Sequence, residues 1–336
     1  MRYVVVGAGA VGGTIGGRLA EHGFAVTLVA RGAHGRVLTE RGLTLGTPDG
    51  PRTLNLPVVD GPAALTPEPG DVFVLATKTQ DSLSALDTLS ALPVGGSAAP
   101  GTPAGDVIPL VCAQNGVENE RLALRRFAHV YGMWVMLPGE HLEPGRVSAW
   151  GTPYSGLLDL GRIPAGIDDT ARRIASDLTA SRLLSRPRAQ IMPWKYAKLL
   201  RNLGNAVEAL CGPDAPADEL LARVVAEGTE ALRAAGIEVA TDDAWAAACA
   251  DHVRTGTIDG RTRDGGSSWQ SLTRGLGSIE TDYLNGEIVL LGRQHGVPTP
   301  VNQVLVREAN AAARAGLRPG SRTPDDMLKL ADLTLA

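Results

Sequence analysis

The chain has 336 residues, of which 44% are hydrophobic, and its 32 basic and 36 acidic side chains leave a net charge of −4 at pH 7. This length exceeds what one hydrophobic core usually supports, so we expect two domains. The near balance of charge argues against a generally basic nucleic-acid-binding protein. Only 4% of the residues are aromatic, which leaves few side chains to stack on single strands. We therefore expect no nucleic-acid partner.

The cysteines and the hydrophobic runs indicate the compartment. Cys112, Cys211 and Cys249 lie far apart in apolar stretches and form no CxxC pair, which predicts buried thiols in a reducing compartment and no metal site. No run of 18 apolar residues occurs, and the glycines near the N-terminus disfavour the apolar helix of a secretory signal. We expect a cytoplasmic protein without a membrane partner, and we leave open whether it is a monomer or a homodimer.

The first half of the chain alternates short apolar runs with helical spacing. Strands are predicted at residues 3–7, 25–30, 72–76 and 107–113, and a helix at residues 11–22. Strands that are apolar on both faces and alternate with helices are typical of a parallel sheet covered on both sides. Residues 92–105 are rich in Gly, Pro and Ala, which predicts a surface loop.

The pattern changes in the second half. One more strand is predicted at residues 155–160 and a helix at 168–179, and from Pro193 onward the sequence is rich in Ala, Leu, Glu and Arg. We place the domain boundary near residue 188. The predicted fold class is α/β, with a doubly wound sheet in residues 1–188 followed by an all-helical domain in residues 189–336.

A glycine-rich turn joins the first predicted strand to the first helix. Its sequence is Gly7-Ala8-Gly9-Ala10-Val11-Gly12, which is the GxGxxG pattern of Rossmann-type dinucleotide-binding domains. In this pattern the first glycine permits the tight turn, the second lets the backbone approach the pyrophosphate, and the third lets helix and strand pack closely. The phosphates are held at the helix N-terminus. A purely structural turn is the alternative.

The residue after the second predicted strand indicates which dinucleotide is bound. An NAD-selective site usually has Asp or Glu here to accept a hydrogen bond from the ribose 2′-hydroxyl, and no acidic residue precedes Glu40. Arg31, with Arg36 nearby, would instead pair with the 2′-phosphate of NADP. We therefore predict NADP(H) as the cofactor, with an ordinary loop arginine as the alternative.

One predicted helix places a lysine between two carboxamides. At about 100° per residue, Asn202 lies about 40° from Lys198 and Asn205 about 20° on its other side, while a separate leucine-rich face is apolar. Asn is a mediocre helix former, so two of them beside a lysine indicate a site that needs fixed donors and acceptors. A lysine can protonate a carbonyl oxygen while a hydride reaches its carbon. A solvated helix face is the alternative.

Taken together, these residues resemble the ketopantoate reductase (2-dehydropantoate 2-reductase) family over nearly the whole chain. The N-terminal motifs that carry the resemblance are the GxGxxG turn, Arg31, Lys78 in ATKTQD, and Gln114-Asn115-Gly116. The C-terminal ones are Lys198-Leu199-Leu200-Arg201-Asn202, Ser267-Ser268-Trp269-Gln270, and Glu280 within the segment 279–286. The resemblance implies NADPH-dependent reduction of a small 2-oxo acid, foremost 2-dehydropantoate to pantoate on the pathway to pantothenate and coenzyme A.

The resemblance also implies a role for each residue. Lys198 would donate the proton to the 2-oxo group, and Glu280 would orient it; these two are the predicted catalytic residues. Lys78 would assist in binding the cofactor. Asn115 would contact both nicotinamide and substrate. The remaining substrate-binding residues would be Asn202, Asn205 and Ser268.

Four departures from the family pattern all fall on the substrate side. The two asparagines of the lysine helix are separated by two residues instead of three, and Trp194 precedes Lys198 by an unusual four positions. Gly265 and Gly266 stand where the family has an Asn before its serine pair, and Ser271 replaces an Asp. The alternatives are therefore a dehydrogenase of another 2-oxo or β-hydroxy acid on the same scaffold, and an NADPH-binding sensor without turnover.

Overall fold

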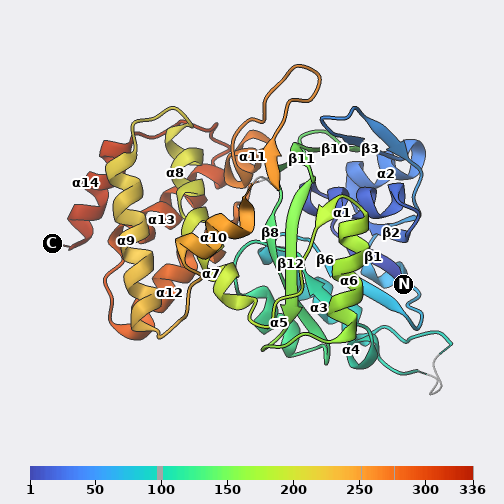
Figure 1. The fold of residues 1–336 in the computed structure, drawn as a ribbon. Coiled ribbons are helices and arrows are strands. Elements are labelled where there is room, and N and C mark those ends of the chain that lie inside the picture. Colours follow the sequence, from blue (N-terminus) through green and yellow to red (C-terminus); the bar gives the residue numbers. More distant parts are fainter. Residues whose placement is uncertain (97–100, 251, 276, 336) are drawn as a thin grey trace. The chain divides into compact units, whose positions relative to one another are not determined.

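The computed structural model describes residues 1–96, 101–250, 252–275 and 277–335. Contacts between Cα atoms divide the chain into two compact units, which we describe separately (Figure 1). Unit 1 comprises Met1–Gln114, Glu118–Met192 and Asp242–Arg263, and unit 2 comprises Asn115–Val117, Pro193–Thr241 and Asp264–Ala336. Two segments therefore depart from a single cut near residue 188: 242–263 pack with the N-terminal unit, and 115–117 pack with the C-terminal one.

An eight-stranded sheet forms the centre of unit 1. Its strands in spatial order are β13 (Leu183–Leu184), β12 (Gly156–Arg162), β8 (Val130–Met136), β7 (Leu110–Cys112), β6 (Asp71–Leu75), β1 (Arg2–Val6), β2 (Ala25–Val29) and β5 (Val58–Val59). All neighbouring strands are parallel except β8 and β12. The predicted doubly wound α/β sheet is thus confirmed, with one antiparallel pair toward an edge.

Helices cover the sheet, which is why its strands are apolar throughout. The helices of unit 1 are α1 (Ala10–Glu21), α2 (Gly32–Arg41), α3 (Ser82–Ala91), α4 (Ala104–Val107), α5 (Asn119–Leu124), α6 (Asp169–Ala180) and α10 (Asp242–Cys249), with short 3₁₀ turns at η1 (Pro62–Ala64) and η2 (Thr79–Asp81). Val5 shares a core cluster with Ile15 of α1 and Ile174 of α6. Its neighbours Val4 and Val6 point to the opposite face and are also buried. Both faces of the sheet therefore exclude water.

Two smaller sheets complete unit 1. One has the order β4 (Arg52–Leu54), β3 (Leu43–Gly46), β10 (Arg146–Ala149) and β9 (Gly139–Glu140), and the other pairs β11 (Gly151–Pro153) with β14 (Val253–Thr255). The four-stranded sheet packs on α1, since a Cβ atom added at Gly13 would lie 2.8 Å from Val147. The predicted loop at 92–105 is tied together at its ends by a bridge between Pro93 and Pro103, and its residues 97–100 lie outside the described ranges.

The regular secondary structure described in unit 2 is helical. Its helices are α7 (Met192–Asn202), α8 (Gly204–Cys211), α9 (Asp218–Ala234), α11 (Ser267–Thr273), α12 (Asn285–His295), α13 (Pro300–Arg314) and α14 (Pro324–Leu335), with the 3₁₀ turn η3 (Glu280–Tyr283). This confirms the predicted C-terminal helical domain. Within the described ranges, no helix is both long and apolar enough to cross a membrane.

A buried amide pair links four helices of unit 2. The Asn285 side chain donates hydrogen bonds to Asn302 Oδ1 at 3.0 Å and to the Leu203 carbonyl at 3.1 Å, between α7 and α8. Asn302 Nδ2 in turn donates to Glu227 Oε2 at 2.8 Å, and that carboxylate accepts the backbone N–H groups of Val301 and Asn302. Glu227 thereby caps the first turn of α13, where a carboxylate also favours the helix dipole. The network fixes the point at which α7 ends.

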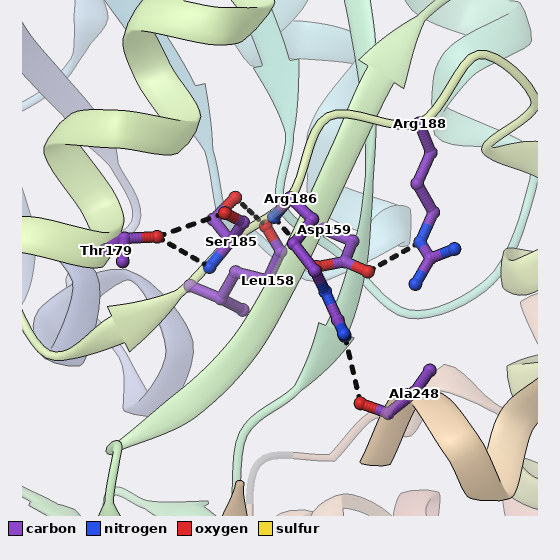
Figure 2. A network of polar contacts seen from close by, with 7 residues as sticks. All are labelled: Leu158, Asp159, Thr179, Ser185, Arg186, Arg188 and Ala248. Carbon is purple, nitrogen blue, oxygen red and sulfur yellow. Dashed lines mark hydrogen bonds and ion pairs between the residues drawn. The ribbon is translucent and has the colours of Figure 1, made fainter.

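A buried carboxylate ties α10 to the sheet of unit 1 (Figure 2). Asp159 on β12 has 0% of its side chain exposed and accepts hydrogen bonds from Arg188 Nε at 2.5 Å and from the backbone N–H of Arg186 at 2.9 Å. Arg186 also donates to the carbonyl of Ala248 at 2.9 Å. Trp134 stacks in the same region, 5.7 Å from the Arg188 guanidinium and 4.6 Å from Trp245 of α10. The segment 242–263 is thus anchored far from its sequence neighbours.

Replacing Asp159 by Asn should lower the free energy of unfolding by about 3 kcal/mol, since it removes one partner of a buried ion pair. Asp49→Asn is the matched control, because Asp49 pairs with Arg182 on the surface and is 52% exposed; its loss should cost less than about 1 kcal/mol. Urea denaturation followed by tryptophan fluorescence measures both. Equal losses for the two variants would contradict a structural role for the Asp159 network.

Candidate functional site

The glycine-rich turn of unit 1 is constrained by contacts within the protein itself. Gly7 follows β1 with φ +98°, a conformation that favours glycine, and donates its N–H to the Val29 carbonyl at 3.0 Å. A Cβ atom added at Gly12 would lie 2.0 Å from the Gly7 carbonyl oxygen and 3.0 Å from Val5. Helix α1 can therefore approach β1 this closely only because residue 12 is glycine.

Gly9 differs from the other two glycines. A Cβ atom added there would meet no backbone, and its nearest neighbour would be His141 Nδ1 at 3.7 Å. Gly9 is also the N-cap of α1, where no side chain caps the helix and no acidic residue occupies the first turn. The protein itself does not require glycine at this position, so the free space is suited to an anionic ligand that approaches the helix N-terminus.

Lys78 lies next to this turn, at the point where the strand order of the sheet reverses. β1 and β6 are neighbours at this switch point, and a Cβ atom at Gly7 would lie 2.9 Å from the Thr77 backbone nitrogen. Lys78 is half-buried and immediately precedes η2. Gln114, at the end of β7, donates hydrogen bonds to the Thr77 carbonyl at 2.9 Å and to Ser82 Oγ at 2.8 Å, and so fixes this loop. Gln114 thus has a structural role in this loop that its place in the Gln-Asn-Gly motif does not by itself indicate.

Arg31 occupies the position expected for a residue that reads the cofactor ribose. It follows β2 directly, serves as the N-cap of α2, and its side chain is exposed. Within the described ranges it makes no hydrogen bond or ion pair, so its guanidinium is free to meet an anion.

The other predicted residues gather in unit 2. Asn115 belongs to the segment that packs with this unit, and a Cβ atom at the adjacent Gly116 would lie 3.0 Å from the carbonyl of Tyr283 in η3. Glu280 is the first residue of η3, and its side chain is only 5% exposed. The Asn115 turn and the Glu280 turn are therefore neighbours, although 165 positions separate the two residues in the chain.

The lysine helix is interrupted at one residue. Lys198 and Asn202 belong to α7 and Asn205 to α8, but Leu203 at the break keeps a helical backbone with φ −60° and ψ −32°, so the angular placement of Asn205 stays a prediction. At the break, the Leu203 N–H is shared between the carbonyls of Leu199 and Leu200 at 3.1 and 3.3 Å. Asn205 lies beside the turn that precedes α11, where a Cβ atom at Gly266 would be 3.4 Å from its Oδ1.

The two lysines of α7 differ in burial. Lys195 is only 3% exposed, while Lys198 is half-buried. A half-buried ammonium group can reach a ligand, and a fully packed one is held within the protein. This difference agrees with the choice of Lys198 as the proton donor, a role that stays a prediction.

Several polar side chains of unit 2 are buried, and the described residues supply no hydrogen bond to atoms such as Asn202 Nδ2, Thr281 Oγ1 and Asn285 Oδ1. Asn202 is 5% exposed, and Ser268, at the second position of α11, is 2% exposed. Buried polar groups are almost always satisfied in folded proteins, so each such exception needs an explanation. For Asn202, a bound ligand with oxygen acceptors is one that also fits the predicted role.

The structure explains why two glycines precede the serine pair. A Cβ atom at Gly265 would lie 2.5 Å from the Trp269 ring, and one at Gly266 would lie 2.6 Å from Glu208 Oε2. Glu208 also accepts the Gly266 N–H at 2.8 Å. A side chain at either position would therefore collide with the indole or displace the Glu208 carboxylate, which favours the glycines found where the family has an asparagine.

No candidate metal centre accompanies these groups. In the part of the chain that the structure describes, no three His, Cys, Asp or Glu side chains are grouped as metal ligands would be. The polar side chains among the predicted site residues are lysine, carboxamide, hydroxyl and carboxylate groups.

Comparison with known proteins agrees with this arrangement. Residues 3–164 match the family model described as "Ketopantoate reductase PanE/ApbA", and residues 190–313 match "Ketopantoate reductase PanE/ApbA C terminal". The chain belongs to the ketopantoate reductase family. It is therefore a nicotinamide-dependent oxidoreductase of the 2-dehydropantoate 2-reductase type.

Individual relatives are similar over nearly their whole length. The 2-dehydropantoate 2-reductase of Pyrococcus horikoshii is 26% identical, and the alignment covers 96% of this chain and all of that protein. A PanE/ApbA family ketopantoate reductase from Ralstonia eutropha is 25% identical with a TM-score of 0.75, covering 94% and 99% of the two chains. A D-mandelate dehydrogenase, solved with NADH and anilino(oxo)acetate, has the same fold at 22% identity, with a TM-score of 0.77 over 94% and 99%.

Gly9→Ala and Gly12→Ala should separate cofactor binding from folding. Gly9→Ala should leave the free energy of unfolding within about 0.5 kcal/mol of the parent but weaken dinucleotide binding, because its methyl group occupies the approach to the α1 N-terminus. Gly12→Ala should cost about 1–3 kcal/mol through overpacking against Gly7. Urea denaturation and fluorescence titration with the dinucleotide measure the two effects. A stability loss in Gly9→Ala as large as that in Gly12→Ala would refute this assignment.

Proposed function

We propose that this protein reduces a small 2-oxo acid with NADPH, and that its substrate is 2-dehydropantoate, which becomes pantoate. The observation that carries the proposal is the buried Asn202 Nδ2, to which the described residues offer no hydrogen bond, in the same unit as Ser268, Lys198 and Glu280. These groups suit the oxygen-rich end of an oxo acid. Family membership supports the same reaction.

The residues of unit 1 would hold the cofactor. The free space at Gly9 and the uncapped N-terminus of α1 suit its pyrophosphate, and the exposed Arg31 suits a 2′-phosphate. Lys78 lies at the switch point where such cofactors bind. When bound, the reduced nicotinamide supplies the hydride.

The residues of unit 2 would act on the substrate. Asn202 and Ser268 donate hydrogen bonds to its carboxylate and hydroxyl oxygens, and Asn115 and Asn205 extend this set. The Lys198 ammonium group gives its proton to the 2-oxo oxygen, so that the carbonyl becomes a secondary hydroxyl and the lysine is left neutral until solvent reprotonates it. Glu280, which is buried, would orient the lysine.

A second candidate is the reduction of a different 2-oxo acid. The family asparagine before the serine pair is absent, and Trp269 and Glu208 lie beside the two glycines that stand there. Oxidation of NADPH with 2-dehydropantoate, compared with straight-chain, branched and aromatic 2-oxo acids, separates the candidates. A higher kcat/KM for any of the others would displace 2-dehydropantoate.

We also propose a place in the pathway to pantothenate and coenzyme A, in the cytoplasm. The cysteines support a reducing compartment, because Cys112, Cys211 and Cys249 form no disulfide in the described part of the chain; Cys112 is buried as predicted, whereas Cys211 and Cys249 are only partly buried. Burial, with a smaller effect of Asp326, raises the pKa of the Cys211 thiol to about 11. It therefore stays protonated and unreactive near neutral pH.

Lys198→Ala should lower kcat with 2-dehydropantoate by roughly 10²- to 10⁴-fold, the usual effect of losing a general acid. The matched control is Lys195→Met, which keeps the buried aliphatic stem of the neighbouring lysine and should retain kcat within a few-fold. Initial rates of NADPH oxidation measure both, and circular dichroism checks the fold. If kcat falls strongly in Lys195→Met and stays near the parent value in Lys198→Ala, the proton donor is Lys195 and not Lys198.

Arg31→Ala should reduce kcat/KM for NADPH by roughly 10- to 100-fold and leave that for NADH nearly unchanged, because only NADPH carries the 2′-phosphate. Arg41→Ala, at the opposite end of α2, is the control and should change neither value. Equal use of both cofactors by the parent enzyme, or no effect of Arg31→Ala, would remove the NADPH assignment.

A further inference from the structure

Two histidines lie against the glycine-rich turn in unit 1. His34 is on α2 and His141 follows β9, and their ring centroids are 4.2 Å apart with the planes tilted by 47°. A Cβ atom at Gly9 would have His141 Nδ1 as its nearest neighbour, at 3.7 Å. His141 therefore borders the free space that Gly9 leaves at the N-terminus of α1.

Both ring nitrogens of His34 are hydrogen-bonded to the backbone. Nδ1 accepts the Gly145 N–H at 2.9 Å, and since an acceptor nitrogen carries no proton, the proton is on Nε2, which donates to the Ala8 carbonyl at 2.8 Å. His34 is thus a neutral ring held in one orientation. It connects the loop after β9 to Ala8, which precedes Gly9 in the turn.

The strand before His141 is fixed on the same helix end. A Cβ atom at Gly139 of β9 would lie 3.3 Å from both the Cβ and the carbonyl oxygen of Ala10. β9 is also paired with β10 through Gly139 and Ala149. His141 is therefore placed by main-chain packing on one side and by the His34 ring on the other, as expected for a side chain that meets a ligand.

We propose that His141 binds the phosphate bridge of the dinucleotide, and that His34 is a positioning residue for it. Imidazole N–H groups donate to phosphate oxygens, and they would add a side-chain donor to the backbone N–H groups of α1. The proposal rests on the dinucleotide cofactor of the proposed function. Because the phosphate bridge is common to NAD and NADP, the contribution of His141 is the same for both, unlike that of Arg31.

Dissociation constants measured by calorimetry test the proposal. His141→Ala should raise Kd for NADP⁺ and for NAD⁺ by the same factor, roughly 10-fold or more, as for a hydrogen bond to a charged group. Adenosine 2′-monophosphate lacks the phosphate bridge, so its Kd should be unchanged. The matched control is His22→Ala, at the C-terminal end of α1, which should change none of the three values. His141→Asn is the second variant if His141→Ala folds poorly.

The positioning role of His34 has its own readout. His34→Ala should raise the Kd for NADP⁺ less than His141→Ala does, and should add little once residue 141 is alanine. Two fully additive effects would show that His34 acts independently of His141 and would overturn the positioning role.

The remaining outcomes are distinguishable. An unchanged or lower Kd for both dinucleotides in His141→Ala overturns the proposal, since His141 would then contribute nothing to binding or would hinder it. An equal loss for adenosine 2′-monophosphate also overturns it, because the effect would be structural. Failure of the parent protein to bind either dinucleotide would reject the proposed function itself, and this inference with it.

Discussion

The candidate site of unit 2 depends on how the protein satisfies one carbonyl group. Where α7 ends, the Leu203 carbonyl is buried, and it accepts its hydrogen bond from Asn285. Leaving such a group unpaired would cost about 1–3 kcal/mol. Asn285 is held by Asn302, and Asn302 by Glu227, so the break in the helix is specified from α9, α12 and α13 at once. The same break determines which residues share a helix with Lys198.

Much of the architecture of unit 1 could be predicted from the sequence, because buried parallel strands and amphipathic helices have distinct patterns. β1, β2, β6 and β12 begin and end within two residues of the predicted ranges, as does α1. The strand predicted at 107–113 is shorter, since Pro109 has no N–H to donate in the middle of a sheet, and β7 begins only at Leu110. The smaller sheets were not predicted. Their strands have two to four residues, too few to show a period.

For the candidate site too, features set by local sequence could be predicted, and features set by contacts distant in the chain could not. Residues inside local motifs could be placed from sequence, as with Gly12, whose contact with Gly7 lies within one turn. The break at Leu203 could not, because the carbonyl there is hydrogen-bonded to Asn285, 82 positions away. His141 gave no sequence signal either, since its position beside Gly9 arises from β9 packing on α1. Gly265 departs from the family pattern, and the reason is a contact that the motif alone does not reveal: a Cβ atom there would lie 2.5 Å from the Trp269 ring.

The division of roles between the units has a consequence for how such an enzyme can change over evolutionary time. The glycine-rich turn, Arg31 and Lys78 belong to unit 1, whereas Asn115, the lysine helix, Ser268 and Glu280 belong to unit 2. All four departures from the family pattern fall in unit 2. On the roles proposed above, mutations that change which acid is reduced can accumulate in unit 2 without affecting how unit 1 binds the hydride donor. Related proteins can in this way come to reduce different acids while they keep the same cofactor.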